Sequence, residues 1–245
     1  MKQMNLTILS NECIAEDIYR MVFETGEMLV EKPGQFINIK IDGFFLRRPI
    51  SISDWTDNTL TIIYKVVGAG TEVMKEMTAG QVLDVLLPLG NGFDIMQSGE
   101  RPLLVGGGVG VPPMFGVAKE LIAAGVKPVV VMGFNEESQI FLAEDFEAIG
   151  AEVHIATADG SVGTKGFVTD VVKDLEYTSI FTCGPLPMLR ALDSCAPAEI
   201  PGWFSFEERM GCGFGACMGC SCKTKYGNKR ICKDGPILER GEIIW

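Results

Sequence analysis

Four cysteines close to the C-terminus constrain the fold of this chain most strongly. Cys212, Cys217 and Cys220 are spaced as C-x4-C-x2-C, and Cys232 follows after a short gap. This spacing is typical of the ligands of a plant-type [2Fe-2S] cluster. The intervening residues are nearly all small, so backbone N–H groups can close around the inorganic sulfides. The segment is therefore predicted to fold around a one-electron redox centre with these four cysteines as ligands.

A zinc site and a set of reduced, uncoordinated thiols are the alternatives for this segment. Zinc ribbons usually supply two separate C-x2-C pairs, whereas only Cys217 and Cys220 form such a pair here. Spacing and glycine content favour the iron–sulfur cluster. Cys222 is interpreted as a strand residue just outside the cluster, and an exchange of roles with Cys232 stays open. The short gap to Cys232 indicates a trimmed cluster domain rather than a whole ferredoxin.

Composition limits the class of protein and its partners. The chain has 245 residues, 47% of them hydrophobic, which suffices for two small domains and an appendage. No stretch is both apolar and long enough to span a bilayer, so no membrane association is expected. Eight cysteines, crowded toward the C-terminus, favour a reducing compartment, and the cytoplasm is the expected location. A net charge of -11 argues against nucleic acid as a partner.

The sequence pattern divides the chain into three regions, and together they predict an α+β multidomain fold. Residues 1–98 contain closely spaced β-like runs separated by glycine and proline, which predicts a small antiparallel β-barrel. Residues 99–202 alternate apolar strands with amphipathic helices, which predicts a doubly wound parallel sheet. Residues 203–245 are too few to hold a core alone, so the cluster is expected to supply much of their folding energy.

A glycine-rich turn leads from an apolar strand into a helix predicted over residues 114–124. Gly107, Gly108 and Gly110 would let a pyrophosphate approach the backbone at the helix N-terminus. A tight turn that needs positive φ is the alternative interpretation. A second motif, which contains Cys183 and Gly184, ends a later strand, and ligands of open α/β sheets bind at that edge. The two motifs together predict a nicotinamide dinucleotide site.

Glu136 and Glu137 follow the second strand of this region, where a dinucleotide fold usually places the adenosine ribose. A carboxylate accepts a hydrogen bond from a free 2′-hydroxyl and repels a 2′-phosphate. NADH is therefore predicted in preference to NADPH. A solvated loop with ordinary charges is the alternative.

Two motifs in the first region are candidates for binding a diphosphate. Arg48, Pro49 and Ser51 belong to an R-P-x-S sequence, in which proline fixes the chain while arginine and serine offer donors. Gly70 and Thr71 belong to a G-x-G-T sequence that precedes a helix-like stretch. Taken alone, each is more typical of an ordinary surface turn.

The order of the four motifs, R-P-x-S, G-x-G-T, G-G-G-x-G-x-P and C-G-P-x-x-M, resembles the ferredoxin-NADP reductase superfamily, which joins an FAD-binding barrel to a nicotinamide domain. The resemblance covers essentially the whole chain. With the cluster segment at the C-terminus, the chain is similar to the family of electron-transfer subunits of NAD-dependent dihydroorotate dehydrogenase B. The sequences E-E-R-M-G-C and C-K-D-G-P around the ligands make this match specific.

The resemblance implies a role for individual residues. FAD would be held by Arg48, Pro49, Ile50, Ser51, Ile63, Tyr64, Lys65, Gly70 and Thr71. Cys183, the catalytic candidate, and Gly184 would lie near the nicotinamide and the isoalloxazine. The resemblance also implies cluster ligation by the four cysteines already identified from their spacing.

The resemblance further implies a function and a partner. A partner subunit with FMN would oxidise dihydroorotate in pyrimidine synthesis, and this chain would pass the electrons through [2Fe-2S] and FAD to NAD+. Two copies of each subunit are implied. FAD is needed because the cluster carries one electron while nicotinamide accepts a hydride. Phe214 and Met218, apolar residues of the cluster loop, are candidate partner contacts.

Two other functions stay open at this point. A related reductase subunit could serve a sulfide dehydrogenase or a bifurcating NADH-dependent ferredoxin-NADP oxidoreductase. A redox-sensing regulator would keep the flavin and the cluster without turnover. Of the remaining chemically interesting residues, His154 is predicted to be packed in a strand, and Cys13 and Cys195 are interpreted as small buried thiols.

Overall fold

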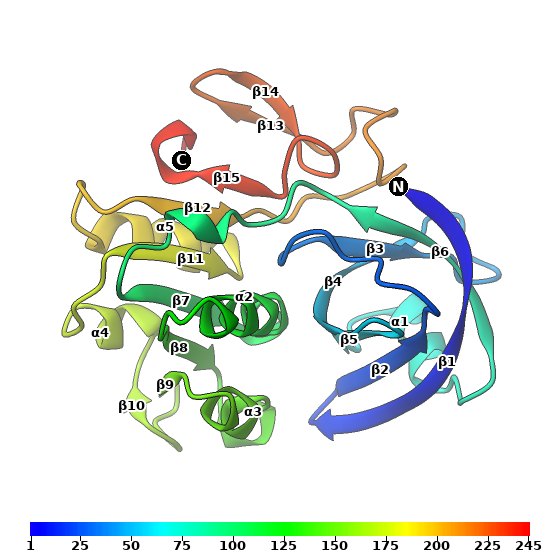
Figure 1. Ribbon diagram of the computed structural model, residues 1–245, viewed down its shortest axis with the longest axis horizontal. Coiled ribbons are helices and arrows are strands. Elements are labelled where there is room, and N and C mark those ends of the chain that lie inside the picture. The colour runs from blue at the N-terminus through cyan, green and yellow to red at the C-terminus, as the bar shows by residue number, and fades with distance from the viewer.

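The computed structural model describes all 245 residues and shows the two predicted domains side by side, with the C-terminal segment lying over both (Figure 1). The first domain is a closed antiparallel barrel with strand order β1-β2-β5-β4-β3-β6. Its elements are β1 (Lys2–Ala15), β2 (Ile18–Glu24), β3 (Phe36–Ile39), β4 (Arg48–Trp55), β5 (Thr59–Lys65), α1 (Ala69–Lys75) and β6 (Val82–Leu89). The predicted barrel is therefore confirmed.

Alternate side chains of β3 are buried on opposite faces of the strand, inside and outside the barrel. Ile37 and Ile39 are fully buried inside the barrel, where each contributes about 1.5–3 kcal/mol by leaving water. Phe36 and Asn38 therefore take the opposite face of the strand. Phe36 shares a core with residues of the C-terminal segment, so the outer face of β3 is also covered.

The second domain is a sheet with strand order β10-β9-β8-β7-β11-β12-β15. Its strands are β7 (Pro102–Gly107), β8 (Val129–Phe134), β9 (Glu152–Thr157), β10 (Thr164–Lys165), β11 (Ser179–Cys183), β12 (Gly202–Ser205) and β15 (Ile237–Glu239). The strands from β10 to β12 are parallel, as predicted. The C-terminal segment adds β15 antiparallel to β12, and the boundary expected at residue 202 falls on the first residue of β12.

Helices cover both faces of this sheet. They are α2 (Val111–Ala123), α3 (Ala143–Ala148), α4 (Val168–Val172) and α5 (Leu186–Cys195), with short 3-10 turns η1 (Ile95–Gln97), η2 (Gly108–Gly110), η3 (Glu137–Gln139) and η4 (Arg240–Glu242). Helix α2 begins three residues before the predicted start because two prolines occupy its first turn, where no N–H is required. None of the helices is both long and apolar enough to cross a lipid bilayer.

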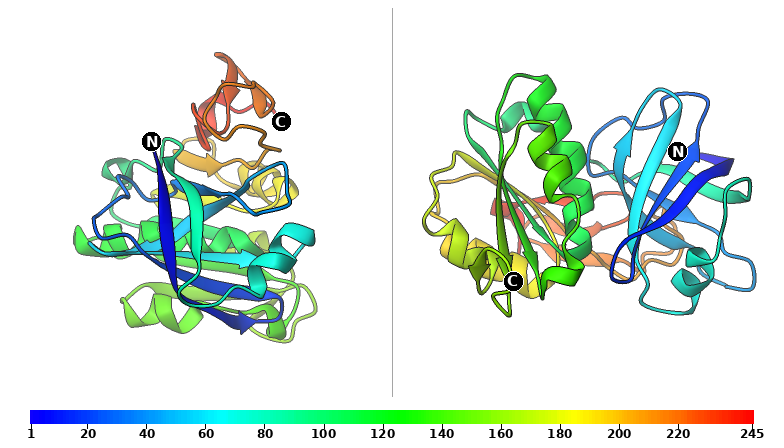
Figure 2. Two further views of the ribbon diagram at one scale, coloured as in Figure 1. Left: turned by 90° about the vertical axis from the view of Figure 1, so that its right-hand side faces the viewer. Right: turned by 90° about the horizontal axis from the view of Figure 1, so that it is seen from below.

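Helix α2 lies between the sheet and the barrel and fixes the two domains against each other (Figure 2). Gly116 packs on the Trp55 ring so closely that an added Cβ would lie 2.7 Å from it. One turn further along, Lys119 forms an ion pair with Asp54 of β4. The absence of a side chain at Gly116 and the ion pair between Lys119 and Asp54 thus determine how α2 packs against the barrel.

The C-terminal segment forms a hairpin of β13 (Ser221–Thr224) and β14 (Gly227–Arg230) before it enters β15. Its buried side chains share one hydrophobic core with both other domains. Ile231 and Leu238 belong to the same cluster as Phe36 and Leu89 of the barrel and Leu189 of α5. The segment therefore has no separate core and packs against both domains, and Figure 2 shows it lying across the two.

Candidate functional site

The cluster loop joins β12 to β13 and presents backbone N–H groups to cysteine sulfurs. The N–H groups of Ala216 and Cys217 donate to the Cys212 Sγ at 3.2 and 3.4 Å. Gly219 N–H donates to the Cys217 Sγ at 3.5 Å, and Cys232 N–H donates to the Cys220 Sγ at 3.4 Å. Amide donors to sulfur are what thiolates carrying the charge of an iron–sulfur cluster require.

The pKa of the first cysteine shows the effect of these donors. Burial opposes ionisation of Cys212, but N–H groups of Cys217, Phe214 and Ala216 outweigh it and lower the thiol pKa to about 6. Cys222 behaves differently, because its thiol donates to the Lys223 carbonyl at 3.6 Å. Burial, followed by the charges of Glu208 and Glu242, raises the pKa of Cys222. Burial also raises the pKa of Cys232, to about 12, so pKa does not distinguish the two thiols. Cys232 is the one that contacts Cys220, through its N–H and its thiol, and these contacts fit Cys232 better than Cys222 as the fourth ligand.

An ion pair braces the turn that carries Cys232. Arg230 Nε and Nη2 donate to the two carboxylate oxygens of Asp234 at 2.8 and 3.0 Å. Arg230 Nη1 also donates to the Gly215 carbonyl at 3.0 Å, which connects this turn to the cluster loop. The hydrogen bonds from Arg230 lower the pKa of Asp234 to about 2, so the pair is ionised at neutral pH.

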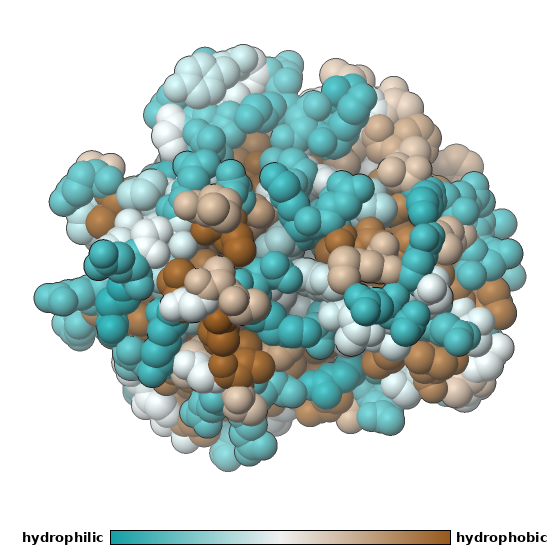
Figure 3. Space-filling model, in the orientation of Figure 1, coloured by the Kyte–Doolittle hydropathy of each residue, from teal (hydrophilic) through white to brown (hydrophobic).

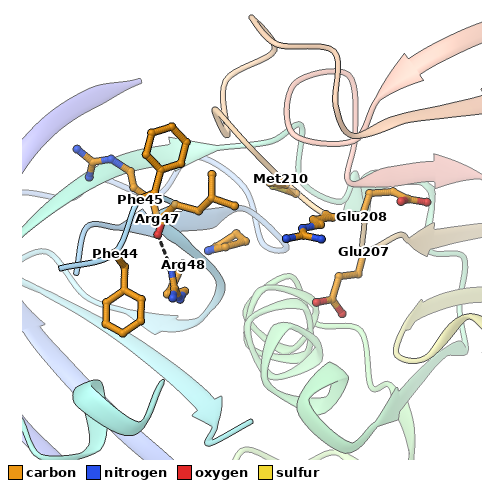
Figure 4. Close-up of a pocket in the computed structure, with 10 residues that line it drawn as sticks. Phe44, Phe45, Arg47, Arg48, Glu207, Glu208 and Met210 are labelled. Atoms are coloured by element: carbon orange, nitrogen blue, oxygen red, sulfur yellow. Dashed lines mark hydrogen bonds between the residues drawn. The ribbon is translucent and has the colours of Figure 1, made fainter. Parts of the chain in front are cut away.

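A cavity of about 630 Å³ separates the barrel from the start of the cluster segment (Figure 4). Residues 44–49 line one side and residues 207–210 line the other. Arg48 lies in this wall, with its guanidinium 4.7 Å from the centre of the Phe44 ring. A Cβ added to Gly70 would overlap that guanidinium, so the R-P-x-S and G-x-G-T motifs meet here. Because arginine pairs well with phosphate, the cradle fits the diphosphate of a flavin dinucleotide.

The other predicted flavin residues occupy different environments. Ile50, Ser51 and Lys65 are half-buried, whereas Ile63 faces α2 outside the barrel. The Tyr64 side chain points into the barrel, where its hydroxyl donates to Asn11 Oδ1 at 3.1 Å. Any flavin contact made by Tyr64 would therefore come from its main chain.

The hydroxyl of Thr71 is used within its own turn. It accepts from the N–H groups of Val67 and Gly68 at 2.9 and 3.2 Å and donates to the Gly68 carbonyl at 2.9 Å. The contribution of the G-x-G-T motif to a ligand is therefore the room that Gly70 leaves beside Arg48, while Thr71 fixes the turn.

The glycine-rich turn and the C-G-P motif touch each other at the carboxyl edge of the sheet. A Cβ on Gly110 would overlap the Cys183 carbonyl and would lie 2.7 Å from the Gly184 N atom. A Cβ on Gly107 would lie 2.6 Å from the Met188 sulfur. Gly108 has a φ of +51°, which agrees with the turn that needs positive φ. The structure thus brings together the two motifs from which the nicotinamide site was predicted.

The Cys183 thiol is neutral at physiological pH. Desolvation by packed neighbours raises its pKa to about 12, although a hydrogen bond with Ser205 acts in the opposite direction. A thiol in this state is neither a nucleophile nor a source of negative charge. At the end of β11, a neutral Cys183 thiol is suited to van der Waals contact with the predicted nicotinamide or flavin ring rather than to covalent chemistry.

Glu207 lies at a central place in the site, although the sequence analysis assigned it no role. It lines the large cavity and also a smaller hollow of about 140 Å³ beside Gly184, Leu189 and Phe206. Its charge acts on Cys183 and helps to raise the pKa of that thiol. Glu207 therefore marks the junction of the flavin cavity with the nicotinamide turn. Glu207 begins the E-E-R-M-G-C sequence, which was quoted for the family resemblance but gave no indication that this side chain lies between two cavities.

Three further predictions concern single residues. Glu136 and Glu137 lie beyond the carboxyl end of β8 and are exposed. The interpretation of Cys13 and Cys195 as buried thiols is wrong, because both are exposed near the ends of β1 and α5. His154 lies on β9, half-buried and outside the hydrophobic cores, with its Nε2 3.0 Å from Glu152 Oε1.

Comparison with known proteins gives a consistent assignment along the chain. Residues 207–244 match the family described as "Iron-sulfur cluster binding domain of dihydroorotate dehydrogenase B", and residues 104–194 match "Oxidoreductase NAD-binding domain". A protein of Fusobacterium nucleatum is 44% identical over 99% of each chain, and one of Lysinibacillus sphaericus is 44% identical over 99% of this chain and 98% of its own. Both are described as "Dihydroorotate dehydrogenase B (NAD(+)), electron transfer subunit".

Solved structures confirm the fold. The structure of an NADH-dependent reduced ferredoxin-NADP oxidoreductase superposes with a TM-score of 0.89 and 28% identity, covering 98% of this chain and 90% of that one. The ferredoxin reductase of carbazole 1,9a-dioxygenase superposes with a TM-score of 0.72 over 81% of this chain and 66% of that one, at 21% identity. Two domains of ferredoxin-reductase type and a C-terminal iron–sulfur segment are thus established.

Proposed function

This chain belongs to the family of dihydroorotate dehydrogenase B (NAD(+)) electron transfer subunits, and on that premise we propose that it passes electrons from a dihydroorotate-oxidising partner through [2Fe-2S] and FAD to NAD+. The observation that carries the proposal is the order of the three sites. Met210 lines the flavin cavity two residues before Cys212, and Glu207 lines both that cavity and the hollow beside the nicotinamide turn. Adjacent sites are what stepwise electron transfer needs.

The cluster would be held by Cys212, Cys217, Cys220 and Cys232, with Cys222 outside the ligand set. The amide donors to the Cys212, Cys217 and Cys220 sulfurs support this assignment. The same donors would stabilise negative charge on the cluster and so influence its reduction potential.

The flavin would lie in the cavity between the barrel and residues 207–210. Arg48 would hold its diphosphate beside Gly70, and residues 49–51 and 63–65 would line it from β4 and β5. A bound FAD supplies the exchange between one-electron and hydride chemistry. The chain itself supplies the positive charge of Arg48, the two walls of the cavity, and the room left by Gly70.

The nicotinamide dinucleotide would bind at the turn formed by Gly107, Gly108 and Gly110, with Gly184 on the opposite side. The positive dipole end of α2 favours a pyrophosphate there, although Pro112 and Pro113 contribute no N–H donor to the first turn. Cys183 would contact the nicotinamide as a neutral thiol and orient it. Glu136 and Glu137 would favour the 2′-hydroxyl of NADH over a 2′-phosphate.

The partner would be the FMN-containing subunit that oxidises dihydroorotate, in a cytoplasmic complex with two copies of each chain. Phe214 and Met218 of the cluster loop have exposed fractions of 42% and 54%. Figure 3 shows moderately apolar atoms gathered at the upper right, where Figure 1 places this loop. Apolar side chains next to the cluster would bring the partner within reach of the electron path.

The test of this function is dihydroorotate-dependent reduction of NAD+ by the complex purified through this chain. We expect turnover with NAD+ at least tenfold above that with NADP+. A complex that oxidises NADH with a dye but never responds to dihydroorotate would refute the proposed partner and keep the flavin and cluster chemistry. A protein without a flavin or cluster spectrum would refute the whole proposal.

A reductase subunit with another partner is the second candidate. The superposition on the NADH-dependent reduced ferredoxin-NADP oxidoreductase over 98% of this chain favours it. In that case the purified complex would reduce NADP+ with electrons from NADH only when reduced ferredoxin is also supplied. The two candidates therefore give opposite results with dihydroorotate.

A further inference from the structure

Two consecutive arginines line the large cavity, and only one of them is neutralised by a carboxylate. Arg47 Nη2 donates to both carboxylate oxygens of Asp84 at 3.0 Å, and its Nη1 donates to the Asp84 carbonyl at 2.9 Å. Arg48 has no such partner, and its Nη1 donates to the Leu46 carbonyl. The charge of Arg47 is therefore used within the barrel, whereas the charge of Arg48 is available to a ligand.

The Nε–Nη2 edge of the Arg48 guanidinium faces the turn before α1. A Cβ added to Gly70 would overlap both of these nitrogens. The only hydrogen bond of the side chain is the one from Nη1, so both Nε and Nη2 keep their donors free. An arginine edge of this kind binds a phosphate through two parallel hydrogen bonds, which suits the proposed flavin diphosphate.

The face of the same guanidinium lies against an aromatic ring. Arg48 Cζ is 4.7 Å from the centre of the Phe44 ring, within the range of a cation–π interaction, and Figure 4 shows the two side chains next to each other. The ring is itself supported, because it packs on the hydrophobic core of the barrel. Phe44 therefore fixes the plane of the guanidinium and leaves the Nε–Nη2 edge free.

Burial alone does not distinguish the aromatic residues of this loop. Phe45, the next residue, is fully exposed, and its ring points away from Arg48 in Figure 4. The loop thus tolerates an aromatic ring in water. What sets Phe44 apart is that its ring connects the barrel core to the guanidinium of Arg48.

We propose that Phe44 is a positioning residue for the flavin: it acts through Arg48, holding the guanidinium by its face so that the Nε–Nη2 edge meets the FAD diphosphate. The proposal rests on the proposed flavin site. A guanidinium that is already ordered loses less side-chain entropy when the ligand binds than one that moves freely in water. Loss of the ring therefore weakens FAD binding although the donors of Arg48 are still present.

Release of FAD from the purified complex measures this effect. After dilution and filtration, chromatography separates the released FAD from any other flavin of the complex. We expect Phe44→Leu to release FAD about fivefold faster than wild type, because the cation–π contact is lost. Phe44→Tyr keeps the aromatic face and is expected to release FAD at the rate of wild type.

Met4→Ala is the matched control for lost packing. Met4 packs on the same barrel core as Phe44 but does not line the cavity. We expect this variant to melt at a lower temperature than wild type and to release FAD at the same rate.

A double-mutant cycle shows whether Phe44 acts through Arg48. Phe44→Leu is repeated in an Arg48→Gln background, in which no guanidinium is left to be held. We expect no further acceleration of FAD release there, because the effect of the ring depends on the arginine. An equal acceleration in both backgrounds would overturn the inference, since Phe44 would then act by packing alone.

The outcomes separate this inference from the proposed function. A wild-type complex that contains no FAD refutes the proposed flavin site. A Phe44→Leu complex that holds FAD as tightly as wild type overturns the role of Phe44 alone, and so does a Phe44→Tyr complex that releases FAD as fast as Phe44→Leu. If Phe44→Leu yields no folded complex, Phe44→Met, which is also apolar and has no ring, replaces it in both backgrounds and is judged by the same criteria.

Discussion

Because Gly110 has no side chain, the glycine-rich turn can pack directly against the C-G-P motif. A methyl group there would meet main-chain atoms of Cys183 and Gly184, which cannot rotate away as a flexible side chain can. The C-G-P loop would have to move, and overpacking of this kind costs about 1–3 kcal/mol. A substitution of Gly110 is therefore expected to change both the stability of the domain and the shape of the proposed nicotinamide site.

We expect Gly110→Ala to raise the KM for NADH at least tenfold, as measured by NADH oxidation with an artificial acceptor, while the cluster spectrum stays unchanged. Gly241→Ala is the control, because a Cβ there would meet no atom within 4 Å. A Gly110→Ala variant with the KM of wild type would show that dinucleotide binding does not depend on this contact.

Cys183 gives a prediction for high pH. Burial raises its pKa to about 12, above the ordinary value of 9.0 that applies to the unfolded chain. Below pH 9 both states keep the proton and the contribution to stability is complete. Between pH 9 and 12 the unfolded state loses the proton first, so the free energy of unfolding falls as pH rises, by at most about 1.4 kcal/mol per pH unit.

Urea unfolding between pH 8 and 11 measures this effect. The stability of wild type is expected to decrease more steeply than that of Cys183→Ala, since the variant lacks the titrating thiol. Parallel curves for the two proteins would contradict a raised pKa at this position.

At the scale of elements, the C-terminal turn η4 holds the end of α5. The Arg240 guanidinium makes hydrogen bonds with Asp193 Oδ1 (2.5 Å) and with the carbonyls of Pro197 (2.6 Å), Ile200 (2.9 Å), Asp193 (2.8 Å) and Ala196 (2.9 Å). The last carbonyls of a helix have no partner within it, and a cation also interacts favourably with that end of the helix dipole. One arginine thus connects the last turn of the chain to the nicotinamide domain.

Arg240→Leu is expected to lower the free energy of unfolding by about 2–3 kcal/mol, because several carbonyls lose a charged donor at once. Arg240→Lys should recover only part of this, since an ammonium group cannot reproduce the fork of five donors. Urea titration followed by circular dichroism provides the measurement. Equal stability of the leucine variant and wild type would show that water replaces the arginine without loss.

At the scale of the whole molecule, the cluster segment covers both domains and leaves its loop available to a partner. We expect Phe214→Ser with Met218→Ser to weaken partner binding at least tenfold in size-exclusion and titration experiments. NADH oxidation with a dye should remain, because these side chains do not line the flavin cavity. Phe167→Ser, at a side chain that is 71% exposed on another surface, is the control. An intact complex of the double variant would place the interface elsewhere.

The sequence alone was sufficient for features encoded by local spacing. The alternation around Ile37 and Ile39 predicted a barrel strand, which the structure contains. The cysteine spacing predicted four cluster ligands, and backbone N–H groups donate to the sulfurs of three of them, Cys212, Cys217 and Cys220. Such patterns are readable because the period of a strand and the reach of a short loop are fixed by backbone geometry. The exposure of Cys13 and Cys195 was missed, since residue type gives only an average tendency to be buried.

Only the tertiary structure decided which surfaces meet. Strand β15 enters the sheet of the other domain beside β12, Glu207 joins two cavities, and the outer face of β3 turns Asn38 toward Gly213. Each of these relations links residues far apart in the chain or lacks a recognisable motif. Hydrophobic periodicity predicts that one face of a helix or strand is buried, but it does not predict which element covers that face. Hydrophobic burial is non-directional, so the covering element is determined by the packing of the whole molecule.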